Sequence, residues 1–230
     1  MTNGFPLPGQ PTQTLALQHN RVLRNTYMLL GLSMVPTVLG ALVGVQLQFN
    51  FFAGSPFIGF LVFLGIAFGF MYAIERTKES GWGVAILLGF TFFMGLMLSR
   101  ILQVALGFSN GGSLIAMAAG GTGALFVALS SVAAVSKRDF SGMGNFLFAG
   151  VILVLLAGVA NIWFQLPALH LAISVAAVGI FSAYVLYDIN RIVRGGETNY
   201  ISATLAVYLD IYNIFVSLLN LLMALAGERD

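Results

Sequence analysis

The chain has 230 residues, of which 59% are hydrophobic and only 8% are charged. This balance lies far outside the range of water-soluble proteins and excludes a soluble fold. Cysteine is absent, which excludes disulfides, thiolate metal sites and cysteine nucleophiles. The net charge is +2 and basic residues are never more than two in a row, so nucleic acid is not an expected partner. We therefore expect an integral membrane protein solvated by the lipid bilayer.

Uncharged stretches of the sequence predict seven membrane-spanning helices. About 20 helical residues cross a hydrocarbon core of about 30 Å, so the 50 uncharged residues between Arg24 and Glu75 hold two helices. The same reasoning places the seven spans near residues 26–47, 56–74, 82–106, 113–135, 145–165, 167–189 and 201–225. The predicted fold class is therefore all-α. A transmembrane domain occupies residues 26–226 and a short C-terminal tail occupies residues 227–230.

Residues 1–25 are predicted to form a flexible tail. The first twenty are polar and contain Pro6, Pro8 and Pro11, so we expect them neither to build a helix nor to bury apolar area. The first apolar run starts too late and is too long for a cleavable signal peptide. The tail is therefore expected to remain in the mature protein.

The distribution of basic residues predicts the orientation in the membrane. Eight of the ten basic residues fall in the tail and in the loops on one side, namely Arg21, Arg24, Arg76, Lys78, Lys137, Arg138, Arg191 and Arg194. Short loops that carry many Lys and Arg residues stay in the cytoplasm. We therefore expect the N terminus in the cytoplasm and the C terminus outside.

Glycines are dense in the fourth predicted span. Gly120, Gly121 and Gly123 lie within four residues of one another. Small residues let neighbouring membrane helices approach closely. We expect this segment to be a site of tight helix packing.

Three charged residues lie inside predicted spans or at their edges. A charge at membrane depth costs roughly 3 kcal/mol, so it usually faces a bundle interior and has a partner. Asp188 comes about 21 residues after Pro167, near the cytoplasmic boundary, and Asp210 lies on the order of 13 Å into the next helix. The two acids are therefore expected to approach each other. Arg100 lies near the outer interface, where its side chain is expected to reach water.

Polar residues continue around both acids. The seventh predicted helix carries a polar stripe formed by Asp210, Asn213, Ser217 and Asn220. The sixth carries a small or polar face formed by Ser174, Ala177, Tyr184 and Asp188. We expect the asparagines and serines to hydrogen bond between helices, at about 1 kcal/mol each.

Two carboxylates in a poorly solvated site resist being ionised together. Asp188 and Asp210 are therefore expected to hold or release a proton near physiological pH. Arg76, at the cytoplasmic end of the second helix, is a candidate counter-charge; the alternative is an ordinary cytoplasmic anchor.

Metal binding by this chain is expected to be weak. His19 and His170 lack the spacing of transition-metal ligands. Calcium accepts oxygen ligands, and Asp188 and Asp210 with a few carbonyls or waters would form a weak calcium site. Weak binding is compatible with calcium as a permeant ion.

Several motifs identify a resemblance. The segments Val22–Tyr27, Asn161–Ser174, Gly195–Tyr200 and Tyr208–Leu219 resemble the Bax inhibitor-1 family, and more narrowly its bacterial YccA-type branch. The resemblance implies seven helices, with the last one surrounded by two layers of three. It also implies a bacterial inner-membrane protein that modulates the AAA protease FtsH. Because catalytic motifs are missing from the sequence, we expect neither enzymatic activity nor a cofactor.

The same resemblance implies an alternative that is compatible with the first role. Other bacterial members of the family are pH-sensitive calcium leaks, controlled by aspartates in the sixth and seventh helices and an arginine after the second. Asp188, Asp210 and Arg76 correspond to these residues. A remote alternative is an intramembrane aspartyl protease, but Asp210 lacks the flanking glycines of the Gly-x-Gly-Asp motif of that class.

Overall fold

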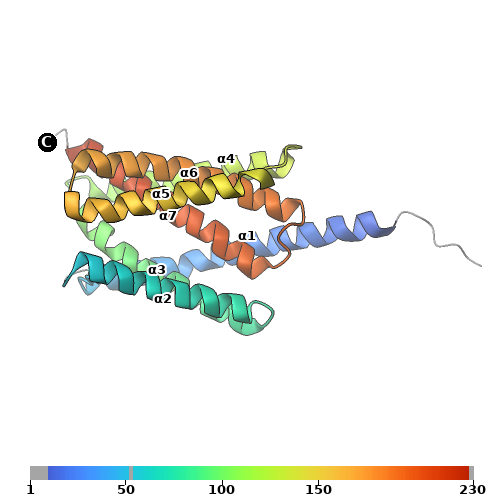
Figure 1. The fold of residues 1–230 in the computed structure, drawn as a ribbon. Helices are drawn as coiled ribbons and strands as arrows, with labels where there is room; N and C mark the ends of the chain where they lie inside the picture. Colours follow the sequence, from blue (N-terminus) through green and yellow to red (C-terminus); the bar gives the residue numbers. More distant parts are fainter. Residues whose placement is uncertain (1–9, 52–53, 228–230) are drawn as a thin grey trace, which may run out of the picture.

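The computed structural model describes residues 10–51 and 54–227 and consists of helices (Figure 1). Seven of them are long and apolar enough to cross a membrane: α1 Gln10–Gln46, α2 Pro56–Thr77, α3 Gly81–Leu106, α4 Gly111–Val135, α5 Gly144–Phe164, α6 Pro167–Val193 and α7 Tyr200–Gly227. A short 3-10 helix, Ser141–Met143, precedes α5. The prediction of an all-α fold with seven spans is confirmed.

The start of α1 differs from the sequence prediction. The helix begins at Gln10, although the first twenty residues of the predicted tail were expected not to build a helix. That expectation is wrong for residues 10–20, because Pro11 occupies the first turn, where a helix does not use the backbone N–H that proline lacks. Residues 1–9 of the predicted tail lie outside the described residues. The apolar, membrane-spanning part of α1 starts at Asn20.

Helix α7 lies in the middle of the bundle. It packs against α1, α2 and α3 on one side and against α4 and α6 on the other. In the first layer α3 lies against both α1 and α2, and in the second α6 lies against both α4 and α5. Figure 1 shows α7 running between the two layers. The central position predicted for the last helix is confirmed, and the buried side chains Val207 and Ile214 show that its apolar faces meet protein rather than lipid.

The helices alternate in direction, so the basic residues gather at one end of the bundle. This end, called the basic end below, contains the start of α1 and the loops α2–α3, α4–α5 and α6–α7, at the right of Figure 1. It carries the eight basic residues Arg21, Arg24, Arg76, Lys78, Lys137, Arg138, Arg191 and Arg194.

Helices α1 and α3 approach each other closely at two glycines, Gly40 and Gly95. A Cβ atom at Gly40 would lie 2.2 Å from the carbonyl oxygen of Phe92, and one at Gly95 would lie 2.1 Å from that of Thr37. At Gly120 and Gly123, by contrast, a Cβ atom would meet nothing within 4 Å. The expectation of tight packing is therefore wrong for Gly120 and Gly123, whereas a Cβ atom at Gly121 would lie 3.4 Å from Cδ1 of Leu218 on α7, which is an ordinary packing contact.

Candidate functional site

The structure brings Asp188 and Asp210 together. Asp188 lies in the last turns of α6 and Asp210 in the third turn of α7, and their side chains are within hydrogen-bonding reach of each other. Asp210 is 4% exposed, while Asp188 is half-buried. The approach of the two acids follows from the antiparallel packing of α6 on α7, as their depths in the sequence predicted.

One oxygen of this pair lacks a partner. Oδ2 of Asp210 is buried and has no hydrogen bond within the described part of the chain. A carboxylate only accepts hydrogen bonds, so two ionised carboxylates repel and cannot bond to each other. One proton shared by the pair provides a donor between the two carboxyl groups and removes one of their two negative charges. The arrangement is therefore suited to binding a single proton.

A small cavity of about 20 Å³ adjoins Asp188 on the side of the basic end. Its wall includes Arg191 and Glu197, together with Ser202 at the start of α7. A polar cavity of this size holds about one water molecule. Such a water would touch Asp188 first, and Asp210 lies behind it.

Arg191 and Glu197 form the outer wall of this cavity. Their side chains make an ion pair of 3.6 Å, and Nε of Arg191 also donates to the carbonyl of Gly196 at 3.2 Å. The chain reverses here because Gly195 adopts a left-handed conformation with φ of 77°, which ends α6. The sequence analysis did not single out this pair, although the double glycine indicates a tight helix end.

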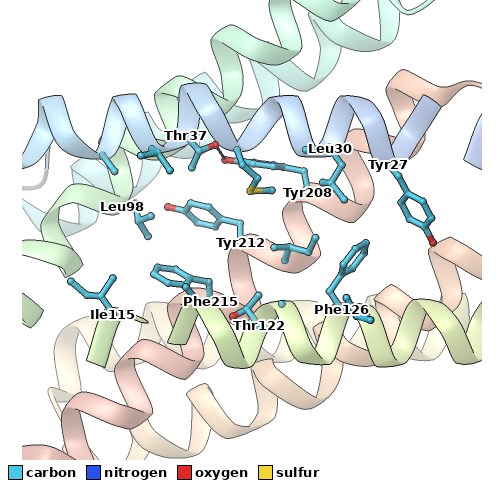
Figure 2. A pocket seen from close by; sticks show the side chains of 18 of the residues that line it. Tyr27, Leu30, Thr37, Leu98, Ile115, Thr122, Phe126, Tyr208, Tyr212 and Phe215 are labelled. Atoms are coloured by element: carbon cyan, nitrogen blue, oxygen red, sulfur yellow. Dashed lines mark hydrogen bonds between the residues drawn. The ribbon is translucent and has the colours of Figure 1, made fainter. Parts of the chain in front are cut away.

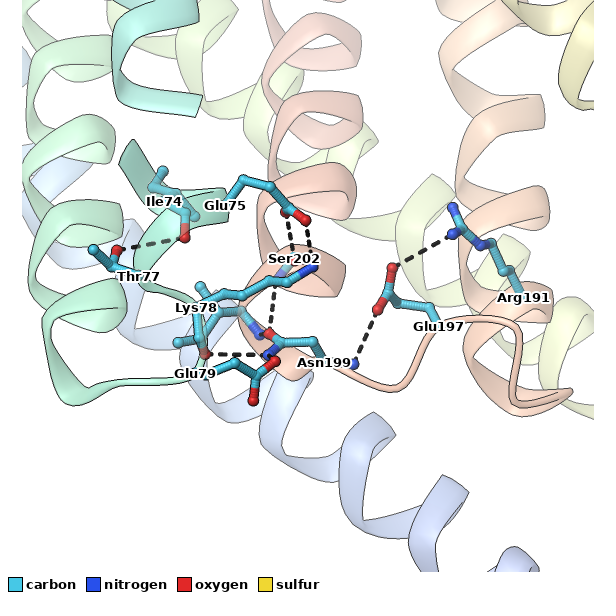
Figure 3. A network of polar contacts seen from close by, with 10 residues as sticks. Ile74, Glu75, Thr77, Lys78, Glu79, Arg191, Glu197, Asn199 and Ser202 are labelled. Atoms are coloured by element: carbon cyan, nitrogen blue, oxygen red, sulfur yellow. Dashed lines mark hydrogen bonds and ion pairs between the residues drawn. The ribbon is translucent and has the colours of Figure 1, made fainter. Parts of the chain in front are cut away.

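Asn199 ties the start of α7 to the α2–α3 turn (Figure 3). Its Oδ1 accepts from the backbone N–H groups of Ile201 and Ser202, which is helix N-capping. Its Nδ2 donates to the carbonyl of Lys78 at 3.1 Å and to the carboxylate of Glu79 at 3.0 Å. An asparagine directly before an apolar helical run is a recognisable capping signal, which the sequence analysis missed.

Glu75 strengthens the same connection. It bonds to Lys78 on its own helix end, and its other oxygen accepts from the Ser202 hydroxyl at 3.2 Å. The Glu75 carboxylate supports the charged form of Lys78 and thereby raises the pKa of that ammonium group. These bonds hold the α2–α3 turn against the start of α7, next to the small cavity beside Asp188.

Arg76 lies apart from the two acids. Its guanidinium is exposed, bonds to the Tyr72 hydroxyl at 3.0 Å and lies over the Tyr72 ring, one turn earlier on α2. The charged side chains that act on Asp188 are instead Arg191 and Glu197. The structure therefore joins two of the three predicted site residues and places a different arginine beside them.

Two residues of the polar faces bond within their own helices. Asn213 Nδ2 donates to the carbonyl of Leu209 at 2.8 Å, and the Ser174 hydroxyl donates to the carbonyl of His170 at 3.0 Å. The predicted hydrogen bonds between helices are therefore wrong for these two side chains. Short side chains that carry a donor, such as serine and here asparagine, can bond to a carbonyl one turn back on their own helix, which competes with partners on other helices.

Asn190 is a buried polar residue that the sequence analysis missed. It is 1% exposed, and its Oδ1 accepts from the backbone N–H of Phe140 at 3.2 Å. Its Nδ2 donates to the carbonyls of Ala133 and Arg138. A single side chain, two residues after Asp188, therefore holds the end of α4 and the α4–α5 loop against α6.

Among the described residues, no group of three or more His, Cys, Asp and Glu side chains is arranged to hold a metal ion. Asp188 and Asp210 thus lack a third ligand of these types.

Comparison with known proteins places this arrangement in a family. The family model described as inhibitor of apoptosis-promoting Bax1 matches residues 19–227. The modulator of FtsH protease YccA from Escherichia coli K12 is 40% identical over 210 residues, which cover 91% of this chain and 93% of that protein. An uncharacterized protein of Neisseria meningitidis serogroup A is 39% identical over 211 residues, covering 91% and 93%.

A further relative, an uncharacterized membrane protein of Vibrio cholerae, is 39% identical over 206 residues, or 90% of each chain. Seven apolar helices, with the first six packed in two layers around the last one, define a multi-span membrane protein in which a carboxyl pair joins α6 and α7. The chain belongs to the Bax inhibitor-1 family.

Proposed function

We propose that this protein modulates an FtsH-type AAA protease in a bacterial inner membrane. The main support is the similarity, at 40% identity over 91% of this chain, to a protein named modulator of FtsH protease. A relative from another Escherichia coli strain, with the same identity and coverage, is named inner membrane protein YccA. The concentration of basic residues at one end supports a cytoplasmic N terminus.

The length of α1 suggests how such a protein engages the protease. The helix has 37 residues, and its membrane-spanning part begins at Asn20. Residues 10–19 therefore extend beyond the span at the basic end (Figure 1). An AAA protease that pulls on this segment meets the close α1–α3 contact at Gly40 and Gly95. A chain that is engaged but resists extraction occupies the protease and slows its other work.

Two experiments test this proposal. The first captures a complex of the protein with FtsH, and the second weakens the helix bundle by mutation. We expect FtsH to co-purify with the protein in mild detergent and from crosslinked membranes, and degradation of a second FtsH substrate to slow when the protein is abundant. Gly95→Ala weakens the α1–α3 contact, so this variant is expected to be degraded and to lose the slowing effect. Gly120→Ala adds a methyl group in open space and is the matched control. Absence of FtsH from both preparations would reject the proposal.

The Asp188–Asp210 contact favours a second function, a pH-sensitive calcium leak, which is compatible with the first. In this proposal the shared proton holds α6 and α7 together at the basic end. Loss of the proton makes the carboxylates repel and loosens this end. Calcium then passes as a weakly bound ion, with carboxylate oxygens as ligands. Protons are the ligand that controls the leak, and no cofactor takes part.

The site beside Asp188 is poorly suited to peptide hydrolysis by the same two acids. The cavity beside Asp188 measures about 20 Å³, which is enough for one water but far too small for a peptide. We therefore propose that the pair binds a proton and that the protein is not an enzyme.

Calcium flux into proteoliposomes across pH tests the leak. Wild type is expected to pass more calcium as pH rises, and Asp210→Asn to lose this dependence because its amide donates a hydrogen bond at every pH. Asp139→Asn is the matched control, because Asp139 is exposed and lies in the α4–α5 loop. Absence of flux in wild type, or an unchanged pH response in Asp210→Asn, removes the leak and leaves protease modulation untouched.

A further inference from the structure

A deep groove runs along the bundle between α1 and α4, with a volume of about 1030 Å³. Figure 2 shows α1 and α4 on opposite sides of it, and Tyr208, Tyr212 and Phe215 of α7 between them. The backbones of α1 and α4 do not pack against each other over the described residues. The groove therefore reaches from the lipid-facing surface to the central helix.

Polar side chains of the groove wall already have partners. The Thr37 hydroxyl donates to the carbonyl of Ser33 at 2.8 Å, and the Tyr208 hydroxyl lies 2.9 Å from Thr37 Oγ1. The Tyr212 hydroxyl lies 3.3 Å from the carbonyl of Met94, and the Thr122 hydroxyl 2.7 Å from that of Ala118. Because the wall is otherwise apolar, a hydrocarbon chain fits it better than a polar ligand.

The groove cannot stay empty at membrane depth. A void leaves its wall without dispersion contacts, and water gains few hydrogen bonds from an apolar wall. Lipid acyl chains are the hydrocarbon that surrounds the bundle. The exposed glycines Gly31 on α1 and Gly123 on α4 add to the width of the groove, because neither would bring a Cβ atom within 4 Å of another residue.

Charge distinguishes the two ends of the groove. Gly31, Val38 and Val45 line it at seven-residue intervals, and Arg24 continues this stripe towards the basic end. On the other side Ala134 ends the groove wall of α4, and the exposed Lys137 follows in the loop.

Arg21, one turn before Arg24 on α1, and Arg138, directly after Lys137 in the chain, are exposed as well, and the exposed acid Asp139 follows Arg138. Basic pockets between membrane helices on the cytoplasmic side bind anionic lipid head groups.

We propose that the α1–α4 groove binds an anionic phospholipid. An acyl chain lies along Tyr208, Tyr212 and Phe215, and the phosphate lies between Arg24 and Lys137 at the basic end. The lipid then contacts the face of α7 opposite to Asp210, because residues 208 and 212 are each two positions, or about 200°, away from it. Lipid and proton sites thus use opposite faces of one helix.

The binding test uses protein reconstituted in bilayers of equal parts phosphatidylglycerol and phosphatidylethanolamine, followed by native mass spectrometry in mild detergent. Wild type is expected to retain phosphatidylglycerol in preference to phosphatidylethanolamine. Gly123→Leu is expected to lower retention at least about tenfold, because a leucine displaces two or more methylene groups worth about fourfold each. Gly120→Leu is the matched control, since Gly120 is also unobstructed but does not line the groove. Gly31→Leu fills the groove from the opposite wall and is expected to act as Gly123→Leu does.

A second arm of the experiment tests the head group. Arg24→Gln is expected to reduce the preference for phosphatidylglycerol, whereas Arg100→Gln, which removes an exposed cation far from the basic end, leaves it unchanged. Equal lipid retention in Gly123→Leu and Gly120→Leu, with both variants folded, would overturn the proposal. So would a wild-type dimer that Gly123→Leu dissociates, because a second copy would then fill the groove. If wild type retains both lipids without preferring phosphatidylglycerol, the assignment of an anionic lipid is overturned.

Discussion

Asp188 on α6 reaches Asp210 on α7 within hydrogen-bonding distance, while Oδ2 of Asp210 stays buried without a partner. This relationship couples helix packing to a proton. With one proton the pair forms a hydrogen bond between α6 and α7, and without it two negative charges face each other in a poorly solvated site. The consequences for stability and for the neighbouring loops are open to direct measurement.

The first prediction concerns the pH dependence of stability. The folded pair holds a proton that the two separated, solvated carboxyls release above about pH 5, so the folded state loses stability as pH rises. Wild type is expected to lose about 1–3 kcal/mol between about pH 5 and pH 8, measured by thermal or denaturant unfolding in detergent. Asp210→Asn is expected to show a flat profile in this range, and Asp139→Asn the wild-type profile. Parallel profiles for wild type and Asp210→Asn would contradict a shared proton.

The second prediction concerns the close contact of α1 and α3. Gly95→Ala places a methyl carbon only 2.1 Å from the Thr37 carbonyl oxygen, so the two helices must separate. We expect a loss of about 1–3 kcal/mol of unfolding free energy, as for other overpacked sites. Gly120→Ala has free space and removes a flexible glycine from a helix, so it is expected to stabilise by about 0.5–1 kcal/mol. A Gly95→Ala protein as stable as Gly120→Ala would show that the α1–α3 contact yields easily.

The contrast between these glycines shows what a sequence pattern can predict. Helix number and depth depend on apolar length alone, and the seven spans were predicted within a few residues, apart from the start of α1. A glycine cluster indicates that close packing is possible but not which neighbour uses it. Gly120 and Gly123 face open space or the groove, whereas Gly40 and Gly95 support the close α1–α3 contact.

The candidate site, too, could be predicted only in part from the sequence. Asp188 and Asp210 were predicted to meet because each depth follows from counting residues along a helix. The cation beside them could not be predicted by counting, because Arg191 is positioned by the left-handed turn at Gly195 and by its ion pair with Glu197. Arg76 lies at a similar depth but turns to Tyr72. Depth is a one-dimensional property that the sequence encodes directly, whereas side-chain direction depends on the packed loops.

The third prediction concerns Asn190, which bonds to three backbone groups at the end of α4 and in the loop that follows. Asn190→Ala leaves these groups unsatisfied and is expected to cost about 1–3 kcal/mol. The loop should also open more often, so trypsin is expected to cut faster after Lys137 and Arg138 in detergent-solubilised protein. Asn213→Ala is the matched control, because Asn213 bonds only to a carbonyl one turn back on its own helix in the described structure. Equal cleavage rates in the two variants would mean that other contacts hold the loop.

The fourth prediction concerns the segment that precedes the first span. Deletion of residues 2–18 leaves the whole membrane-spanning part of α1, which begins at Asn20, in place. Insertion into the membrane is therefore expected to be normal. If FtsH pulls on this end, the truncated protein should be longer-lived than the full chain in cells that contain FtsH, because a protease of this class needs a segment to grip.

The measurement is the decay of both proteins after synthesis is stopped. In cells without FtsH the two lifetimes should coincide, which separates loss of the grip from a change in folding. Equal lifetimes in the presence of FtsH reject this mechanism, since the protease would then be engaging another part of the chain.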